Sequence, residues 1–316
     1  MLQANQYGRI GVLMGGNSSE RSISLRSGEA VLTALRQSGL TVIPVDIQGS
    51  ASEIKSKIQE ANIDIGFIAL HGKGGEDGVI QNLLEELEII YIGSNPDASF
   101  KGFNKLETKK IFAQASIPTP NYVIINKRDL KEKISNFPFP VFIKPLEEGS
   151  SIGVKKISSL EEMLSVAPKE LDAYDSLMVE AAILGRELTV GILGDTALPV
   201  IELRPKREFY DYTAKYTKGM TEYLIPAPVE SAAAKEIQNI ALRAHRALGL
   251  RDFSRVDFML DGGNRPFVLE VNTIPGFTET SLLPKAAKEA GLEFSELCLT
   301  LLQLAKERCL AHGKKK

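Results

Sequence analysis

The sequence predicts an α/β fold with a mostly parallel sheet, followed by two α+β units. In roughly the first hundred residues, short apolar runs alternate with segments of helical periodicity, which is the pattern of a parallel sheet with crossover helices. After residue 98 this pattern gives way to strands separated by turns. A length of 316 residues suits two or three domains of roughly 100–200 residues. We expect three domains, over residues 1–98, 99–184 and 185–316.

The first domain is expected to alternate strands with helices. The strands are predicted at residues 10–14, 41–45, 65–70 and 89–92, and the helices at 20–37, 51–61 and 79–87. Ligands bind at the carboxyl edge of a parallel sheet, where the loops that follow the strands lie. Two of these loops, residues 15–20 and 71–78, are rich in glycine and polar side chains. We therefore expect them to contribute to a ligand site.

The second and third domains are expected to mix strands and helices. A helix is predicted at residues 104–115, and strands follow at 122–125, 141–145, 154–157, 177–180 and 187–193. The third domain begins near Gly185, and its predicted elements are a helix at 231–248, a hairpin at 254–272 and two C-terminal helices. Its polar stretch at 204–223 holds four of the eight tyrosines, which suggests an ordered functional loop.

Composition and charge exclude several classes of protein. Lys plus Arg number 38 and Asp plus Glu number 40, so the net charge of -2 argues against a nucleic-acid binder and favours a small partner. No apolar run approaches the ~18 residues that span a bilayer, and the N-terminus lacks a secretory signal. Cys298 and Cys309 are expected to be buried thiols in a helix, which suits a reducing compartment. We expect a cytoplasmic protein without a membrane partner.

The predicted hairpin of the third domain carries the strongest chemical signal. Its turn at 261–264 implies a register in which Arg255 faces Glu270 and Asp257 lies across from Val268. Side chains alternate between the two faces of a strand. One face should therefore carry Arg255, Asp257, Glu270 and Asn272. The opposite face, expected to enter the core, should carry Val256, Phe258, Leu260, Leu269 and Val271.

Metal binding is one interpretation of the polar face of this hairpin. Asp257, Glu270 and Asn272 offer two carboxylates and a carboxamide, which are hard oxygen ligands suited to Mg²⁺ that bridges phosphate oxygens. The alternative is a solvated polar face with one ion pair between Arg255 and Glu270.

The segment 149–153 matches the GxSxG pattern of a serine-hydrolase nucleophile elbow. An elbow is followed by a helix, whereas the next residues here have the pattern of a strand, so we do not expect a hydrolase. A Gly/Ser loop between two strands can instead fold over phosphate, or it can be an ordinary hairpin turn. Walker A and GxGxxG motifs are absent, so any nucleotide must be held in another way. Lys105 and Lys144 are candidate phosphate contacts, with solvated lysines as the alternative.

Glu20 and His71 also have two interpretations each. The run from Asn17 to Glu20 fits a capping box, in which Asn17 or a neighbouring serine caps the next helix and Glu20 reaches back. The alternative is that Glu20 faces a ligand. His71, in the second glycine-rich loop, would either bind substrate or order the loop.

These motifs occur together and in a fixed order. They are Met14-Gly15-Gly16 through Glu20-Arg21, the loop 71–78, Lys144-Pro145 with Gly149-Ser150-Ser151, Tyr210-Asp211-Tyr212 with Lys215-Tyr216, Arg255-Val256-Asp257, and the run from Glu270 to Gly276. As a set they resemble the D-alanine:D-alanine ligases of the ATP-grasp superfamily. The resemblance implies an ATP-grasp architecture, in which the second and third domains sandwich ATP and the N-terminal domain binds substrate.

The resemblance also implies a reaction and its cofactors. The enzyme would join two D-alanines for peptidoglycan synthesis through a D-alanyl phosphate, with release of ADP and phosphate. Two Mg²⁺ or Mn²⁺ ions per site would be held by Asp257, Glu270 and Asn272. A homodimer is implied as well.

Five residues would bind ATP according to the resemblance. Three lysines would contact phosphates, and two glutamates would hold the adenine side and the ribose: Lys105, Lys144, Lys215, Glu180 and Glu187. Family members often carry a lysine after the first of these glutamates, whereas this sequence has Ala181.

The resemblance assigns further residues to the first D-alanine and to the reacting carbonyl. Glu20 would pair with the ammonium group of the first D-alanine, and His71 would lie near that substrate. Arg255 and the backbone N–H of Gly276 would form an oxyanion hole, which stabilises negative charge in the transition state.

The second D-alanine would place its carboxylate at Ser281 and Leu282, at the N-terminus of a helix. Tyr216 and Ser150 would form a hydrogen-bonded link with Glu20, which closes the tyrosine-rich loop and shields the acyl phosphate from water. In D-alanine:D-lactate ligases a phenylalanine or a differently built loop tends to replace Tyr216, so the resemblance favours the dipeptide-forming enzyme. The alternatives are a ligase with another nucleophile, such as D-lactate, and a non-catalytic binder of ATP or amino acid.

Overall fold

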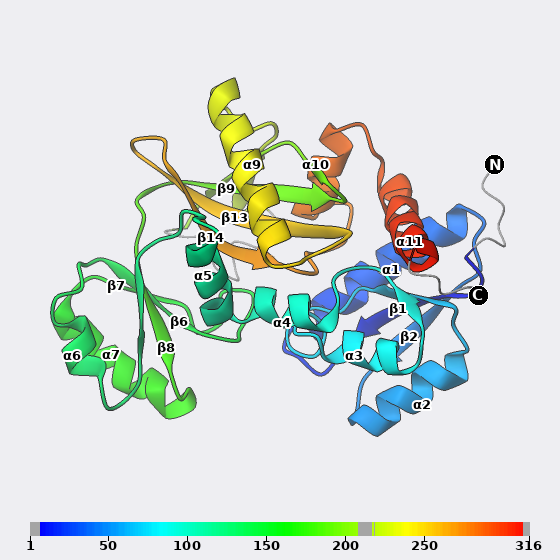
Figure 1. Cartoon of the computed structure of the whole chain (residues 1–316), viewed down its shortest axis with the longest axis horizontal. Helices are drawn as coiled ribbons and strands as arrows, with labels where there is room; N and C mark the ends of the chain where they lie inside the picture. The colour runs from blue at the N-terminus through cyan, green and yellow to red at the C-terminus, as the bar shows by residue number, and fades with distance from the viewer. Residues whose placement is uncertain (1–6, 208–216, 218, 312–316) are drawn as a thin grey trace.

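The computed structural model describes residues 7–207, 217 and 219–311. Figure 1 shows an N-terminal α/β unit in blue and cyan, a second sheet in green, and a third sheet whose strands run from light green (β9) to orange (β13 and β14). One sheet is wholly parallel and the other two are antiparallel in every printed pairing. The predicted fold class is therefore confirmed.

The first sheet has the strand order β2-β1-β3-β4. Its strands are β1 (Ile10–Gly15), β2 (Val42–Ile47), β3 (Ile65–Ile68) and β4 (Ile90–Tyr91), and the helices between them are α1 (Arg21–Gln37), α2 (Ala51–Ala61) and α3 (Val79–Glu86). Every residue of β1 and β3 is buried, which explains why these strands are continuous apolar runs. Both glycine-rich loops follow strands of this sheet, as predicted.

The second sheet has the order β5-β8-β6-β7. Its strands are β5 (Tyr122–Ile125), β6 (Val141–Pro145), β7 (Lys155–Ile157) and β8 (Leu177–Ala181), with helices α6 (Leu130–Ile134) and α7 (Leu160–Ala173). Two helices precede it, α4 (Pro96–Phe103) and α5 (Lys105–Gln114). The sequence patterns did not predict α4, α6 or α7.

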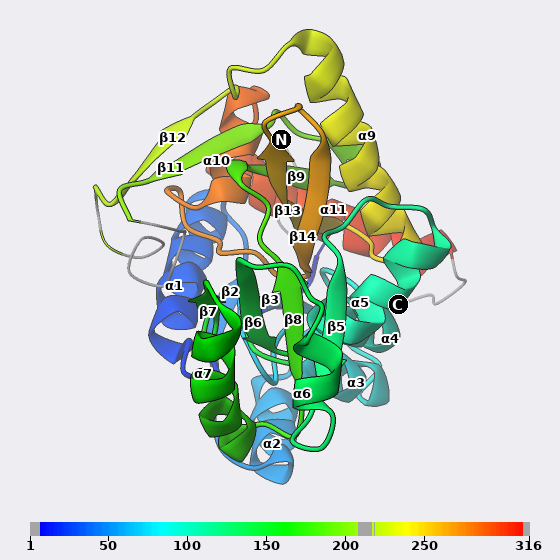
Figure 2. The same cartoon turned by 90° about the vertical axis from the view of Figure 1, so that its left-hand side faces the viewer.

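The third sheet contains the hairpin, in the order β12-β11-β9-β13-β14 with β10 beside β9. Its strands are β9 (Gly185–Leu193), β10 (Thr196–Ala197), β11 (Ile201–Pro205), β12 (Thr221–Leu224), β13 (Phe253–Asp261) and β14 (Pro266–Asn272). Its helices are α9 (Ser231–Ala247), α10 (Leu282–Glu289) and α11 (Phe294–Ala311). Figure 2 shows the second sheet in front with this sheet above it.

The hydrophobic cores do not follow the order of the sequence. Cys298 and other residues of α11 share a core with the first sheet, while Ala98 and Phe112, from α4 and α5, pack into the core of the third sheet. The second sheet has a core of its own. A division of the chain into separate domains at residues 98 and 184 stays a prediction.

The predicted register of the hairpin is wrong for two reasons. The turn is one residue longer than predicted, because the N–H of Asp261 donates to the carbonyl of Arg265 and Leu260 pairs with Pro266. A β-bulge then shifts the register by one more residue. Asp257 pairs with Glu270, but the next pair is Phe258 with Val268, so Leu269 is an extra residue without a partner. As a result Arg255 lies opposite Asn272, not opposite Glu270.

Two smaller expectations about burial are also wrong. Leu269 does not enter the core but lines a cavity, because the bulge turns it to the polar face. Cys298 is buried as predicted, whereas Cys309 is only half-buried. Ala305 is the last buried residue of α11, so Cys309 lies where the helix extends past the core.

Among the described residues, no helix is both long enough and apolar enough to cross a membrane.

Candidate active site

Two cavities lie on either side of the polar face of the hairpin. The first has a volume of about 480 Å³ and lies between the second and third sheets; we call it the nucleotide cavity because Lys144, Glu187 and other residues expected to bind ATP line it. The second has a volume of about 330 Å³; we call it the substrate cavity because Glu20 and His71, which are expected to lie near the substrate, line it. A small third cavity is lined by residues of both neighbours. The hairpin therefore lies where molecules bound in the two larger cavities could come into contact.

The polar residues of the hairpin are brought together as predicted, but with different partners. Arg255 donates from Nε and from one terminal nitrogen to the two carboxylate oxygens of Asp257, at 2.9 and 2.8 Å. Asn272 Nδ2 donates to Asp257 Oδ2 at 2.9 Å, and Thr189 Oγ1 donates to Oδ1 at 2.5 Å. Glu270 lies directly across the ladder from Asp257. Asp257 is thus the centre of the cluster, and Arg255 forms an ion pair with it.

The donor set fits a hard divalent cation that also binds phosphate. Within the described residues, no three His, Cys, Asp or Glu side chains are close enough to hold a metal by themselves. Asp257, Glu270 and Asn272 supply two carboxylates and an amide, so phosphate oxygens and water would complete the coordination. Asn272 can present its amide oxygen in place of its nitrogen by rotating the amide group.

The predicted phosphate lysines reach the nucleotide cavity from two elements. Lys105 is the first residue of α5, and its Nζ donates to the carbonyl of Glu148 at 2.5 Å. Asn104 caps this helix by accepting from the backbone N–H groups of Leu106 and Glu107. Lys144 belongs to β6, where buried and half-buried residues alternate, and it points to the cavity side.

Glu180 lines the nucleotide cavity and is almost fully buried. One of its carboxylate oxygens pairs with Lys144 and the other with Lys109. Burial alone would raise the pKa of Glu180, but the two lysines hold it below its ordinary value. Glu187 and Ala181 also line this cavity. Sequence reasoning missed Lys109, although its place four residues after Lys105 puts both on one helix face.

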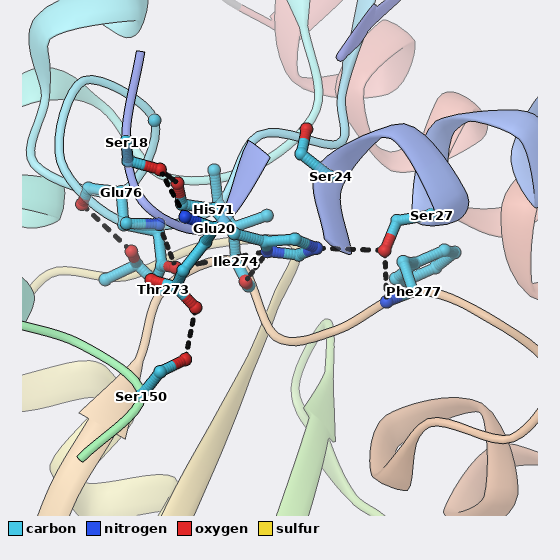
Figure 3. A network of polar contacts seen from close by, with 12 residues as sticks. Ser18, Glu20, Ser24, Ser27, His71, Glu76, Ser150, Thr273, Ile274 and Phe277 are labelled. Carbon is cyan, nitrogen blue, oxygen red and sulfur yellow. Dashed lines mark hydrogen bonds and ion pairs between the residues drawn. The ribbon is translucent and has the colours of Figure 1, made fainter. Parts of the chain in front are cut away.

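The Gly/Ser loop connects the second sheet to the substrate cavity. The hydroxyl of Ser150 donates to Glu20 Oε1, and both residues line the cavity (Figure 3). Ser150 and Ser151 have φ of 50° and 61°, and the chain continues as β7, not as a helix. The nucleophile elbow is therefore excluded on backbone grounds.

Of the two interpretations of Glu20, the structure does not show the capping box. Glu20 is the N-cap of α1 but its side chain makes no capping hydrogen bond. Asn17 bonds instead to the backbone of Gly49, and the hydroxyl of Ser18 accepts from the N–H of Glu20 at 3.2 Å. The carboxylate of Glu20 is thereby left to face the cavity.

His71 is held in one tautomer by its two neighbours. Its Nδ1 lies 3.2 Å from the carbonyl of Ile274, and its Nε2 lies 2.9 Å from the hydroxyl of Ser27 (Figure 3). Burial lowers the pKa of His71 to about 4, so the ring is neutral at pH 7. A carbonyl can only accept, so Nδ1 carries the proton and Ser27 donates to Nε2. Ser27 also accepts from the N–H of Phe277 at 3.3 Å.

Glu76 is a site residue that the motifs did not single out. Its Oε1 accepts from the N–H of Gly72 at 2.8 Å and lies 3.9 Å from His71 Nδ1. Burial, reinforced by the charge of Glu20, raises the pKa of Glu76 to about 8. The polar loop at 71–78 was a signal for the region, but not for this residue.

The far wall of the substrate cavity is formed by the segment after β14. Gly276, Ser281 and Leu282 line it together with Tyr223. Leu282 begins α10, and Ser281 is the N-cap but makes no capping bond to the helix; its hydroxyl accepts from the N–H of Thr278 at 3.0 Å. The first N–H groups of α10 therefore point toward the cavity end of the helix, where an anion is favoured. Lys215 and Tyr216, the remaining predicted residues, lie outside the described residues.

Sequence models of a known family match most of the chain. The model described as the C-terminus of D-ala D-ala ligase matches residues 111–303, and that of its N-terminus matches residues 9–52 and 48–94. The D-alanine–D-alanine ligase of Aquifex aeolicus is 47% identical over 290 residues, which cover 92% of this chain and 98% of that protein. The ligase of Hydrogenovibrio crunogenus is 42% identical over 306 residues, 96% of each chain.

Solved structures agree with the sequence matches. The crystal structure of D-alanine–D-alanine ligase from Bacillus anthracis complexed with ATP superposes with a TM-score of 0.85 at 31% identity, covering 96% of this chain and 99% of that one. VanG D-Ala:D-Ser ligase from Enterococcus faecalis gives a TM-score of 0.81 at 30% identity, covering 95% and 100%. The chain belongs to the D-alanine–D-alanine ligase family.

Proposed function

We propose that this enzyme joins two D-alanines to D-alanyl-D-alanine, with ATP as the energy source, for peptidoglycan precursor synthesis. The observation that carries the proposal is the pair of cavities divided by the polar hairpin face. One cavity is lined by lysines suited to phosphates, and the other is small, polar and suited to amino acids. The relatives are named D-alanine–D-alanine ligases and align with nearly the full length of this chain, which supports the same reaction.

The reaction would proceed in two steps. First, a carboxylate oxygen of one D-alanine attacks the γ-phosphorus of ATP, which gives D-alanyl phosphate and ADP. Next, the amine of the second D-alanine attacks the carbonyl carbon, loses a proton, and expels inorganic phosphate as the peptide bond forms. We assign the ammonium group of the first D-alanine to Glu20, whose buried carboxylate is the charge complement it needs.

Arg255 and the N–H of Gly276 are proposed to stabilise the negative oxygen of the tetrahedral intermediate. Both line the substrate cavity, and the bidentate pairing with Asp257 fixes the plane of the guanidinium group. His71 supports this arrangement as a positioning residue, because its Nδ1 proton binds the carbonyl of Ile274, two residues before Gly276. The neutral ring adds no charge near the ammonium group of the substrate.

Lys105, Lys144, Glu180 and Glu187 are proposed to bind ATP, together with Lys215. Asp257, Glu270 and Asn272 would hold two Mg²⁺ or Mn²⁺ ions, which neutralise charge on the transferring phosphoryl group when bound. Their positions at the junction of the two cavities support this assignment. Ser281 and Leu282, at the start of α10, are proposed to receive the carboxylate of the second D-alanine.

Ser150 is proposed to belong to a link from Glu20 to Tyr216 that closes the loop over the site. The bond from Ser150 to Glu20 supports the first half of that link. A homodimer and a cytoplasmic location, where ATP is available, are further proposals of the family resemblance.

The choice of the second nucleophile is tested by product analysis. Purified enzyme with ATP and Mg²⁺ should release ADP only when D-alanine is present, and mass spectrometry should identify D-alanyl-D-alanine. D-lactate and D-serine should be offered in competition from about pH 6 to 9. Absence of D-alanine-dependent ADP release would overturn the proposed reaction, and a mixed ester or D-alanyl-D-serine as main product would overturn the proposed specificity.

A further inference from the structure

Lys109 is the only lysine or arginine among the described residues that is fully buried, with 1% of its surface exposed. It lies on α5, and it is not among the residues that line the nucleotide cavity. Lys105, one turn earlier, does line that cavity. A buried ammonium group is unfavourable unless it is paired, so its partners indicate its role.

Lys109 shares one carboxylate with a lysine of the nucleotide cavity. Its Nζ pairs with Oε1 of Glu180, while Nζ of Lys144 pairs with Oε2. The side chain of Lys144 is 14% exposed, whereas those of Lys109 and Glu180 are 2% and 1% exposed. Of the two cations, only Lys144 is in a position to exchange Glu180 for a ligand.

Lys109 is fixed by a further contact that does not involve the cavity. Its Nζ also donates to the hydroxyl of Thr119, which in turn donates to the carbonyl of Val268 at 2.8 Å. Val268 belongs to β14 and precedes the bulge residue Leu269. The lysine is thereby held between α5, β8 and β14, so its charge stays beside Glu180.

We propose that Lys109 is a positioning residue: it is the permanent counter-ion of Glu180 and thereby frees Lys144 to bind a phosphate group of the nucleotide. The inference rests on the proposed nucleotide site. A buried carboxylate must keep one cationic partner. Without Lys109, Glu180 would retain Lys144, and binding of a nucleotide would have to break that pair without a replacement.

The test compares ADP affinity in variants of the full-length enzyme. We expect K109M to weaken binding of ADP with Mg²⁺ at least about 10-fold by isothermal titration calorimetry, the loss of one charge-assisted phosphate contact. K110M is the matched control, because Lys110 is the adjacent residue and its exposed side chain pairs with half-buried Glu107 on the same helix. K110M and K109R should bind ADP within about 3-fold of the wild type.

A double variant separates this role from a general loss of packing. In E180Q the carboxylate is gone, so adding K109M should change ADP affinity by less than about 3-fold relative to E180Q alone. If K109M alone does not fold, the comparison of K109M/E180Q with E180Q still decides the matter. The inference is overturned if K109M binds ADP as the wild type does, or if K109M weakens binding 10-fold in the E180Q background too. D-alanine-dependent ADP release by the wild type, measured in parallel, tests the proposed function separately.

Discussion

Replacement of Arg255 by alanine should separate catalysis from nucleotide binding. Arg255 lines the substrate cavity but not the nucleotide cavity, and its side chain is only 11% exposed. The substitution removes a charged donor from the proposed oxyanion position. Loss of one such donor lowers turnover by at least about 100-fold, or about 2.7 kcal/mol in the barrier.

The affinity for ADP should change much less than turnover. Asp257 keeps its hydrogen bonds from Thr189 and Asn272 when Arg255 is lost. We therefore expect R255A to bind ADP with Mg²⁺ within about 3-fold of the wild type in calorimetry, while coupled assays of ADP release show the loss in kcat.

Arg265 provides the matched control on the same hairpin. Its side chain is 76% exposed and pairs with Asp261 near the turn. R265A therefore removes an arginine just before β14 that lines neither the substrate cavity nor the nucleotide cavity. R265A should retain wild-type turnover. The reasoning is refuted if R255A turns over within about 3-fold of the wild type. Equal loss of turnover and of ADP affinity would contradict the catalytic role, since it would place the effect on the structure around Asp257.

Three further outcomes are expected. Burial lowers the pKa of both His71 and His245 to about 4, below the ordinary 6.5, so the unfolded chain binds their protons more readily. Each histidine should therefore contribute a fall of about 3 kcal/mol in the free energy of unfolding between about pH 6.5 and 4, while the raised pKa of Glu76 acts in the opposite direction over part of this range. In urea unfolding, H245Q should lose about 3 kcal/mol less than the wild type between these pH values. A Cβ on Gly28 would lie 2.3 Å from the sulfur of Met14, so G28A should lower stability by about 1–3 kcal/mol in thermal unfolding, whereas G262A, with open space around it, should not. Chelation of divalent cations with EDTA should abolish ADP release and addition of Mg²⁺ or Mn²⁺ should restore it; activity in EDTA would contradict the metal assignment to the hairpin.

Much of the fold follows from local patterns in the sequence. The helix predicted at residues 51–61 has those bounds in the structure, because the capping box of Ser50 and Glu53 marks its start and Asn62, in the left-handed region, its end. The parallel sheet follows from apolar runs such as β1, whose residues are all buried. These signals depend only on neighbouring residues, so one sequence is enough to find them.

The register of the hairpin could not be predicted from its turn. The turn closes between Asp261 and Arg265, one residue later than predicted. The bulge at Leu269 adds a second residue to β14, and nothing in the local sequence distinguishes Leu269 from a regular strand residue. Arg255, Asp257 and Asn272 still share one face of the hairpin, because all three lie on the side of the bulge that is away from the turn. The predicted pairing partners are wrong.

Polar contacts between residues far apart in the chain could not be predicted from the sequence either. Glu20 bonds to Ser150, 130 residues away, and His71 contacts Ile274, 203 residues away. The spacing of neighbouring residues does not indicate contacts across such separations in the sequence. For this reason the sequence around Glu20 fitted a capping box as well as it fitted a ligand contact. The burial of Lys109 could not be predicted either, because it depends on the packing of β8 and β14 against α5.

The central claim is that ATP activates the first D-alanine as an acyl phosphate before the peptide bond forms. The most direct test uses D-alanine labelled with ¹⁸O in its carboxylate and measures the mass of the inorganic phosphate released. Because the oxygen that attacks the γ-phosphorus leaves with it, each phosphate should carry one ¹⁸O atom. Unlabelled phosphate, formed together with the dipeptide, would contradict the mechanism.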